Sequence, residues 1–189
     1  MIKKELRKLY KEKRSQLTFQ QAEKYNDLIL INFQQLQLPF ISCMHTYLSS
    51  EKLMEPDTSA IMRYLQFKNP GLTVLAPKVD FASGKMQHLH FHEEAELAEN
   101  EYGILEPISN AFLDAEEIDL VVVPLLAFDK NGFRVGYGKG HYDMFLATCR
   151  KDVIKIGVSF FEPVDTIGDI DQFDIALNYC ITPENVFKF

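Results

Sequence analysis

Residues 119–143 read DLVVVPLLAFDKNGFRVGYGKGHYD, and this stretch decides the fold. Three successive valines between Asp119 and Pro124 predict a strand that is buried on both faces, as in a parallel sheet. Glycines then occupy the alternate positions 136, 138 and 140, and helical spacing over residues 141–150 predicts a helix directly after them. The stretch therefore predicts a strand, a glycine loop and a helix, an order typical of α/β proteins.

The rest of the chain repeats this alternation of strands and helices. Helical spacing predicts helices over residues 2–14, 18–36 and 58–67, and strand formers predict strands over residues 41–48, 72–76, 154–160 and 179–182. Ser83-Gly84 separates two runs within residues 79–92, which predicts a hairpin, and we expect an exposed helix and loop in the acidic stretch 93–106. We therefore expect a single three-layer α/β domain over residues 1–189, with a mostly parallel sheet flanked by helices and a small hairpin insertion.

Composition narrows the class of protein. The 189 residues are 47% hydrophobic and 25% charged, which suits one globular domain with a substantial core. The formal net charge of −7 argues against binding nucleic acid by broad phosphate neutralisation, so any anion site must be local. No apolar run approaches the ~20 residues of a membrane helix, and the basic N-terminus lacks the apolar segment of a secretory signal. We expect a cytoplasmic protein that binds neither nucleic acid nor membranes.

The glycine loop has the features of a phosphate-binding site. Glycine permits positive φ and lets an anion approach backbone N–H groups without interference from a Cβ atom, and the following helix N-terminus adds partial positive charge. Lys139 and Arg134 would supply full charges. The loop matches neither the Walker motif nor the dinucleotide fingerprint. From the glycines alone, a tight turn without a ligand remains an alternative.

The segment from Asp119 to Asp143 closely resembles the signature of 5-formyltetrahydrofolate cyclo-ligases, also called methenyltetrahydrofolate synthetases. Other segments resemble the family in the same order: the basic N-terminal helix, Tyr47-Leu48-Ser49 before Glu55-Pro56-Asp57-Thr58, the loop Tyr102-Gly103-Ile104-Leu105-Glu106-Pro107, and Asp174 before the last predicted strand. The resemblance covers nearly the whole chain. The sequence departs from the family pattern at His141, which replaces a tyrosine, at Tyr137, which replaces an arginine, and in a longer loop before Glu55.

The resemblance implies an ATP-dependent reaction that converts 5-formyltetrahydrofolate into 5,10-methenyltetrahydrofolate. It implies Mg²⁺ bound by Asp143 and Asp174, and folate bound by Glu55 and Tyr142. Arg134 and Lys139 take the catalytic role of neutralising the transferred phosphoryl group. The implied ATP-binding residues are Lys3, Arg7, Arg134, Gly136, Tyr137, Gly138, Lys139, Gly140, His141 and Tyr142. The small-molecule partners are folate and ATP. Nothing in the sequence sets the oligomeric state, and we take a monomer as the expectation.

The residue types suit this chemistry. The formyl oxygen of an amide is a poor leaving group, and phosphorylation by ATP makes it a better one. Phosphoryl transfer mainly requires positioning and neutralisation of negative charge. Carboxylates are the hard oxygen ligands that Mg²⁺ prefers.

Less specific interpretations stay open at several positions. Lys3 and Arg7 fit solvated charges on a helix, Asp143 fits a helix start, and Asp174 fits an acidic loop with other aspartates. The alternating residues His88, His90 and His92 favour a surface hairpin over a metal site. A sugar-phosphate isomerase, an acyltransferase-like protein or a non-catalytic folate or nucleotide regulator could use a similar sheet.

Overall fold

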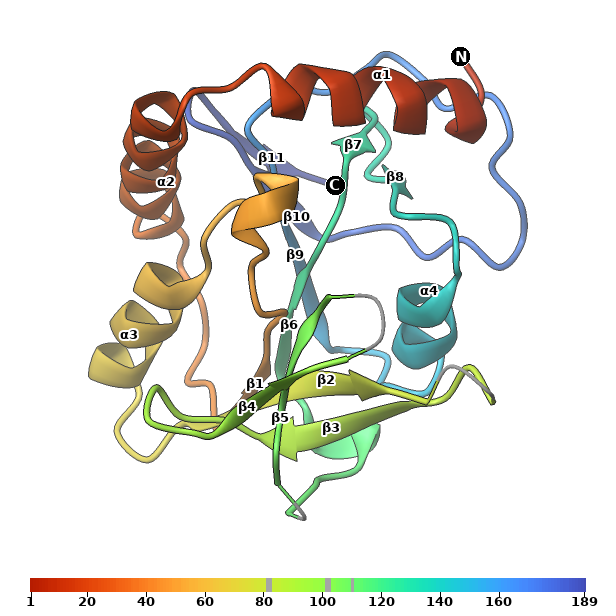
Figure 1. Ribbon diagram of the computed structural model, residues 1–189. Helices are drawn as coiled ribbons and strands as arrows, with labels where there is room; N and C mark the ends of the chain where they lie inside the picture. The colour runs from red at the N-terminus through yellow and green to blue at the C-terminus, as the bar shows by residue number, and fades with distance from the viewer. Residues whose placement is uncertain (81–82, 101–102, 110) are drawn as a thin grey trace.

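A seven-stranded mixed sheet forms the centre of the computed structural model, which describes residues 1–80, 83–100, 103–109 and 111–189 (Figure 1). The strand order is β11-β10-β9-β6-β1-β2-β3. Their bounds are β1 Cys43–His45, β2 Thr73–Val79, β3 Met86–His90, β6 Leu120–Val123, β9 Ile154–Val158, β10 Tyr179–Ile181 and β11 Val186–Lys188. All pairings from β10 to β2 are parallel, and β11 and β3 add antiparallel edges. The predicted mostly parallel sheet with its hairpin, β2-β3, is confirmed.

Strand β6 shows how both faces of the sheet are covered. Leu120 and Val122 pack in the cluster that contains α2 (Phe19–Phe33) and α3 (Ser59–Lys68), whereas Val121 and Val123 pack in the cluster that contains α4 (His141–Leu146). All four side chains are fully buried. Because successive strand side chains point to opposite faces, an unbroken apolar run requires a layer on each side. Figure 1 shows α2 and α3 on one side of the sheet and α4 on the other, which confirms the three-layer α/β fold.

Helix α1 (Lys3–Ser15) lies across the top of the molecule in Figure 1, over a short ribbon of β7 (Ala127–Phe128) and β8 (Arg134–Val135). Its buried side chains, Leu6, Tyr10 and Arg14, follow a four-residue spacing and therefore share one face. The two apolar members pack against the β7-β8 ribbon. Glu5 caps the helix start by accepting a hydrogen bond from the Ile2 N–H at 3.1 Å. The helix therefore holds its remaining faces beside the glycine loop.

The described residues of the acidic stretch, 93–100 and 103–106, do not form the predicted helix. The stretch contributes β4 (Leu97–Glu99) and β5 (Leu105–Pro107), which pair as a separate antiparallel ribbon. The turn between them uses a hydrogen bond of 2.9 Å from the Gly103 N–H to the Asn100 carbonyl, and Gly103 has φ +74°. The prediction was wrong because exposure and acidity do not distinguish an exposed ribbon from an exposed helix.

Other boundaries also differ from those predicted. Helix α4 ends at Leu146 rather than at Arg150. Just after this end, the Thr148 hydroxyl donates to the Phe145 carbonyl at 2.7 Å. Residues 51–53 and 115–117 form short 3₁₀ turns, and β11 follows the predicted last strand. In the described part of the chain, no helix combines the length and apolar character needed to span a membrane.

Candidate functional site

A cavity of about 1450 Å³ lies at the carboxyl ends of the parallel strands. Its lining includes Tyr47 and Leu48 after β1, Pro124 after β6, and Val79 at the end of β2. In the sheet, β2 lies on one side of β1 and β6 lies on the other. The chain runs from β1 to β2 first and adds β6 only later. Such a divergence opens a crevice at the carboxyl edge of an α/β sheet, where ligands commonly bind.

The cavity gathers the predicted site residues from four separate segments. Helix α1 contributes two cations, the loop before α3 contributes a glutamate, the glycine loop continues into α4, and the segment after Ile170 contributes an aspartate. The lining includes Lys3, Arg7, Glu55, Arg134, Gly136, Tyr137, Gly138, Lys139, Gly140, His141, Tyr142, Asp143 and Asp174. Tyr102, which the family resemblance also involved, lies outside the described residues.

Two of the three glycines in the loop use the backbone freedom that glycine provides. Gly138 and Gly140 have φ +95° and +73°, while Gly136 does not have positive φ. Gly138 also lies against Arg7, because a Cβ atom there would be 3.0 Å from Arg7 Nε. That Nε donates to the Gly136 carbonyl at 3.0 Å. The α1 guanidinium therefore packs directly on the loop.

Lys139 lies exposed between the last two glycines. Within the described ranges its ammonium group makes no hydrogen bond or ion pair, so it can approach an anion without breaking an existing contact. Helix α4 begins at the next residue but one and has only six residues, so its dipole adds little to the charge of Lys139. At the start of α4, His141 Nδ1 lies 3.2 Å from the Gly84 carbonyl in the β2-β3 turn.

Four of the predicted charged residues form two ion pairs. Arg134, whose side chain is 4% exposed, donates through Nη2 to Asp143 Oδ1 at 2.8 Å and through Nη1 to the Ile175 carbonyl at 2.6 Å. Lys3 Nζ lies 2.7 and 2.5 Å from the two carboxylate oxygens of Asp174. Predicted phosphate ligands are thus paired with predicted metal ligands, which balances partly buried charges of both signs.

The hydrogen bonds of the Asp143 carboxylate leave one of its oxygens available to a cation. Its Oδ1 accepts hydrogen bonds from Arg134 and from the Ile175 N–H, the latter at 3.1 Å. Its Oδ2 accepts none from the described residues. Both oxygens of Asp174 are engaged, since Oδ2 also accepts from the Asp171 N–H at 2.7 Å. Asp143 therefore fits Mg²⁺ directly, whereas Asp174 fits it after separation from Lys3.

Glu55 is held by two donors at the other side of the glycine loop. Its Oε1 accepts from the Tyr137 hydroxyl at 2.6 Å, and its Oε2 accepts from the Ser50 N–H at 2.9 Å. The Tyr137 oxygen in turn accepts from Arg14 Nη1 at 2.9 Å. Burial and the neighbouring Glu55 carboxylate raise the pKa of Tyr137, so its hydroxyl stays protonated.

Sequence reasoning missed Arg14. The signal was present, because Arg14 continues the four-residue spacing of Leu6 and Tyr10 on the buried face of α1. A cation in an apolar row must find partners in the protein. The sequence could therefore have indicated an internal role, although it could not have named the partner.

A buried group of aromatic and histidine rings lies behind Tyr142. The rings of His45 and His88 are 5.2 Å apart, and His45 lies 6.1 Å from the Tyr142 ring. Burial lowers the pKa of His45 well below its usual value, and burial lowers that of His88 to about 4, with Asp114 opposing the change.

His88 is buried rather than on the surface as predicted, because β3 turns it towards Phe145 of α4. Among the described residues, no group of three or more histidines, cysteines or acids could hold a metal.

The Tyr142 hydroxyl is buried and has no hydrogen-bond partner among the described residues. Burial raises the pKa of this hydroxyl, and the nearby Glu55 carboxylate adds to the shift. Exposed apolar side chains complete the cavity wall. Ile104 and Leu105 belong to the loop that resembles the family, whereas sequence reasoning did not single out Leu53, Met144 and Phe173. The cavity thus combines a cationic loop with an apolar wall and a fixed carboxylate.

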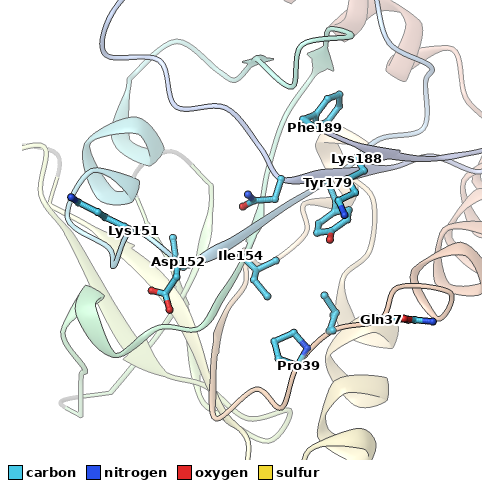
Figure 2. A pocket seen from close by; sticks show the side chains of 11 residues that line it. Gln37, Pro39, Lys151, Asp152, Ile154, Tyr179, Lys188 and Phe189 are labelled. Carbon is cyan, nitrogen blue, oxygen red and sulfur yellow. The ribbon is translucent and has the colours of Figure 1, made fainter.

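A smaller cavity of about 190 Å³ lies at the opposite end of the sheet, near the amino ends of β9 and β10. Figure 2 shows Ile154 and Tyr179 lining it together with Lys151, Asp152 and Lys188. None of the predicted site residues reaches this cavity. The candidate chemistry therefore belongs to the carboxyl edge of the sheet.

Comparison with known proteins shows the family of the chain. Residues 1–183 match the model of the 5-formyltetrahydrofolate cyclo-ligase family. The chain is 32% identical over 133 residues to 5-formyltetrahydrofolate cyclo-ligase of Haemophilus influenzae, covering 65% of this chain and 70% of that protein. It is 34% identical over 171 residues to the mitochondrial 5-formyltetrahydrofolate cyclo-ligase of Arabidopsis thaliana, covering 78% of this chain and 62% of that protein.

Two solved structures share the fold. The 5,10-methenyltetrahydrofolate synthetase of Aquifex aeolicus superposes with a TM-score of 0.80 and 26% identity, covering 100% of this chain and 93% of that chain. The enzyme of the same name from Mycoplasma pneumoniae superposes with a TM-score of 0.76 and 22% identity, covering 97% of this chain and 99% of that chain. The second likeness concerns the fold alone.

Proposed function

The chain belongs to the 5-formyltetrahydrofolate cyclo-ligase family, and from this premise we propose that it converts 5-formyltetrahydrofolate into 5,10-methenyltetrahydrofolate with consumption of ATP. One observation carries the proposal: every residue that the sequence assigned to ATP, folate or metal lines the same cavity. These residues come from segments far apart in the chain, so a chance gathering of unrelated surface charges is a poor explanation. Relatives in bacteria and plants are named 5-formyltetrahydrofolate cyclo-ligases.

The glycine loop binds the triphosphate in this proposal. Backbone N–H groups at Gly138 and Gly140 lie in a segment whose positive φ values suit a concave anion site. Lys139 adds a mobile point charge, and Arg7 approaches the loop from α1. Together they neutralise the charge that spreads over the transferred phosphoryl group.

The cavity also suits the cyclisation chemistry. Glu55 accepts hydrogen bonds from the amino and ring N–H groups of the pterin, and the apolar wall excludes water from the phosphorylated formyl oxygen. Phosphorylation turns this oxygen into a good leaving group. N10 then attacks the formyl carbon and gives up its proton, which closes the ring, and the formyl C–O bond breaks as phosphate departs. The protein's contribution is positioning and charge neutralisation rather than covalent catalysis.

Asp143 and Asp174 would hold Mg²⁺ in this scheme. When bound, the ion offsets phosphate charge and orients the phosphate oxygens. Phosphates compete with Asp174 for Lys3 and with Asp143 for Arg134, because both cations already donate to those carboxylates. ATP binding therefore weakens the two ion pairs and makes the carboxylates more available.

A direct assay tests the proposal. Purified protein is mixed with 5-formyltetrahydrofolate, ATP and Mg²⁺, and the near-ultraviolet absorbance of methenyltetrahydrofolate is followed. Product that forms only with all three components supports the proposal. Well-folded protein that binds both substrates without product would point to a non-catalytic regulator, and turnover of another substrate without ATP would point to an isomerase or acyltransferase.

We further propose that the protein is a monomer of the cytoplasm and that it has no nucleic-acid or membrane partner.

A further inference from the structure

A short chain of hydrogen bonds connects helix α1, the glycine loop and the segment before α3. Arg14 Nη1 donates to the Tyr137 oxygen at 2.9 Å, and the Tyr137 hydroxyl donates to Glu55 Oε1 at 2.6 Å. Arg14 Nη2 also donates to the Leu125 carbonyl, just beyond β6. One buried guanidinium therefore fixes the loop tyrosine relative to the carboxyl edge of the sheet.

The direction of these hydrogen bonds is set by chemistry. Arginine can only donate, so the Tyr137 oxygen must accept from it, and the single hydroxyl proton then goes to Glu55. The Ser50 N–H occupies the other carboxylate oxygen at 2.9 Å. Each oxygen of Glu55 thus receives one donor and keeps lone pairs for a ligand.

The Tyr137 side chain is held by protein groups on several sides. Its ring lies beneath the Lys11 ammonium, 5.5 Å from ring centroid to Nζ, and its hydroxyl is engaged on both sides by protein groups. Glu55 and Tyr137 both line the cavity, whereas Arg14 does not. The hydroxyl is therefore directed towards the carboxylate, and both of its hydrogen bonds are to protein groups.

We propose that Tyr137 and Arg14 are positioning residues for the Glu55 carboxylate, so that the Tyr137 hydroxyl serves folate recognition rather than ATP binding. This inference rests on the proposed function. Arg14 orients the tyrosine, the tyrosine and Ser50 fix both carboxylate oxygens, and Glu55 meets its ligand with no rotamer left to be ordered.

The test is the Tyr137→Phe variant, which removes one oxygen and keeps the ring beneath Lys11. The KM for 5-formyltetrahydrofolate is expected to rise about tenfold, while kcat and the KM for ATP stay within about twofold. Arg14→Lys is expected to raise the same KM. Tyr64→Phe is the matched control, because Tyr64 lies on α3 with its ring 6.1 Å from Phe33 and does not line the cavity.

A double-mutant cycle with Glu55→Gln separates positioning from a general packing effect. If the hydroxyl acts through Glu55, Tyr137→Phe changes the folate KM less than about twofold in the Glu55→Gln background. Independent multiplication of the two effects would overturn the inference, as would an unchanged folate KM or a rise confined to the KM for ATP. Wild-type protein that forms no product would instead overturn the proposed function, and this inference with it.

Discussion

The guanidinium of Arg134 donates to the carboxylate of Asp143, with 2.8 Å between Nη2 and Oδ1, and this contact leaves Asp143 Oδ2 facing no donor among the described residues. Asp143→Asn retains an acceptor for Arg134 but removes the negative charge that suits a cation. The Mg²⁺ concentration for half-maximal activity is expected to rise at least about tenfold, which corresponds to about 1.4 kcal/mol. Activity measured across a Mg²⁺ titration checks this.

Asp152→Asn makes the same chemical change at the opposite end of the sheet. Asp152 is 79% exposed and pairs with Arg150, so its charge does not reach the large cavity. Its Mg²⁺ dependence should match wild type. Equal shifts in the two variants, or none in Asp143→Asn, would contradict the assignment of Asp143.

Lys139 supplies charge at the tip of the glycine loop. Lys139→Ala is expected to lower kcat by about 100-fold, a typical effect of losing one group that stabilises a transition state. Because Lys139 is exposed, the unfolding midpoint should not change. His90→Ala, on β3 outside the cavity lining, should leave kcat close to wild type. A large effect at His90 and none at Lys139 would contradict the site.

Gly138 and Gly136 offer a matched pair in the same loop. Gly138→Ala forces a left-handed backbone on alanine and brings its Cβ atom 3.0 Å from Arg7 Nε, so it should destabilise the fold by about 1–3 kcal/mol. Gly136 lacks positive φ, and a Cβ atom added there would meet no atom within 4 Å, so Gly136→Ala should cost less than about 1 kcal/mol. Urea unfolding of both variants measures the difference. Equal destabilisation would contradict the loop conformation.

Because histidines are buried, we expect the free energy of unfolding to fall in acid. Burial lowers the pKa of His88 from 6.5 to about 4, so the unfolded chain binds this proton more readily than the folded chain does. The contribution of neutral His88 to the free energy of unfolding is fully present above pH about 6.5 and is lost as the pH falls towards 4. This contribution is on the order of 3 kcal/mol. Unfolding free energies at pH 7.5 and 5 should differ less in His88→Leu than in wild type. An unchanged difference would contradict this explanation.

The sequence predicted the features that local patterns determine. The valines of β6 indicated a doubly covered sheet, helical spacing indicated a helix over residues 18–36, and the motif around Lys139 indicated a loop that lines the large cavity. Helix α2 begins at Phe19, after Thr18, whose hydroxyl accepts from the Gln21 N–H at 3.2 Å. These signals lie within a few residues of one another, so they need no knowledge of tertiary contacts.

Features that depend on partners distant in sequence could not be predicted. The hydrogen bond from Tyr137 to Glu55 spans 82 residues, and the ion pair from Lys3 to Asp174 spans 171. The β4-β5 ribbon was mistaken for a helix because its pairing and turn, rather than its composition, determine its form. The predicted charged residues all line one cavity, but the sequence did not show that anions and cations among them would pair.

A crystal structure with a non-hydrolysable ATP analogue and Mg²⁺ tests the central claim most directly. We predict the triphosphate against the backbone of residues 136–140, with Lys139 on its oxygens and the cation beside Asp143. A nucleotide bound in the small cavity beside Lys151 and Lys188, or a large cavity that stays empty at saturating nucleotide, would contradict the assignment of this loop to ATP.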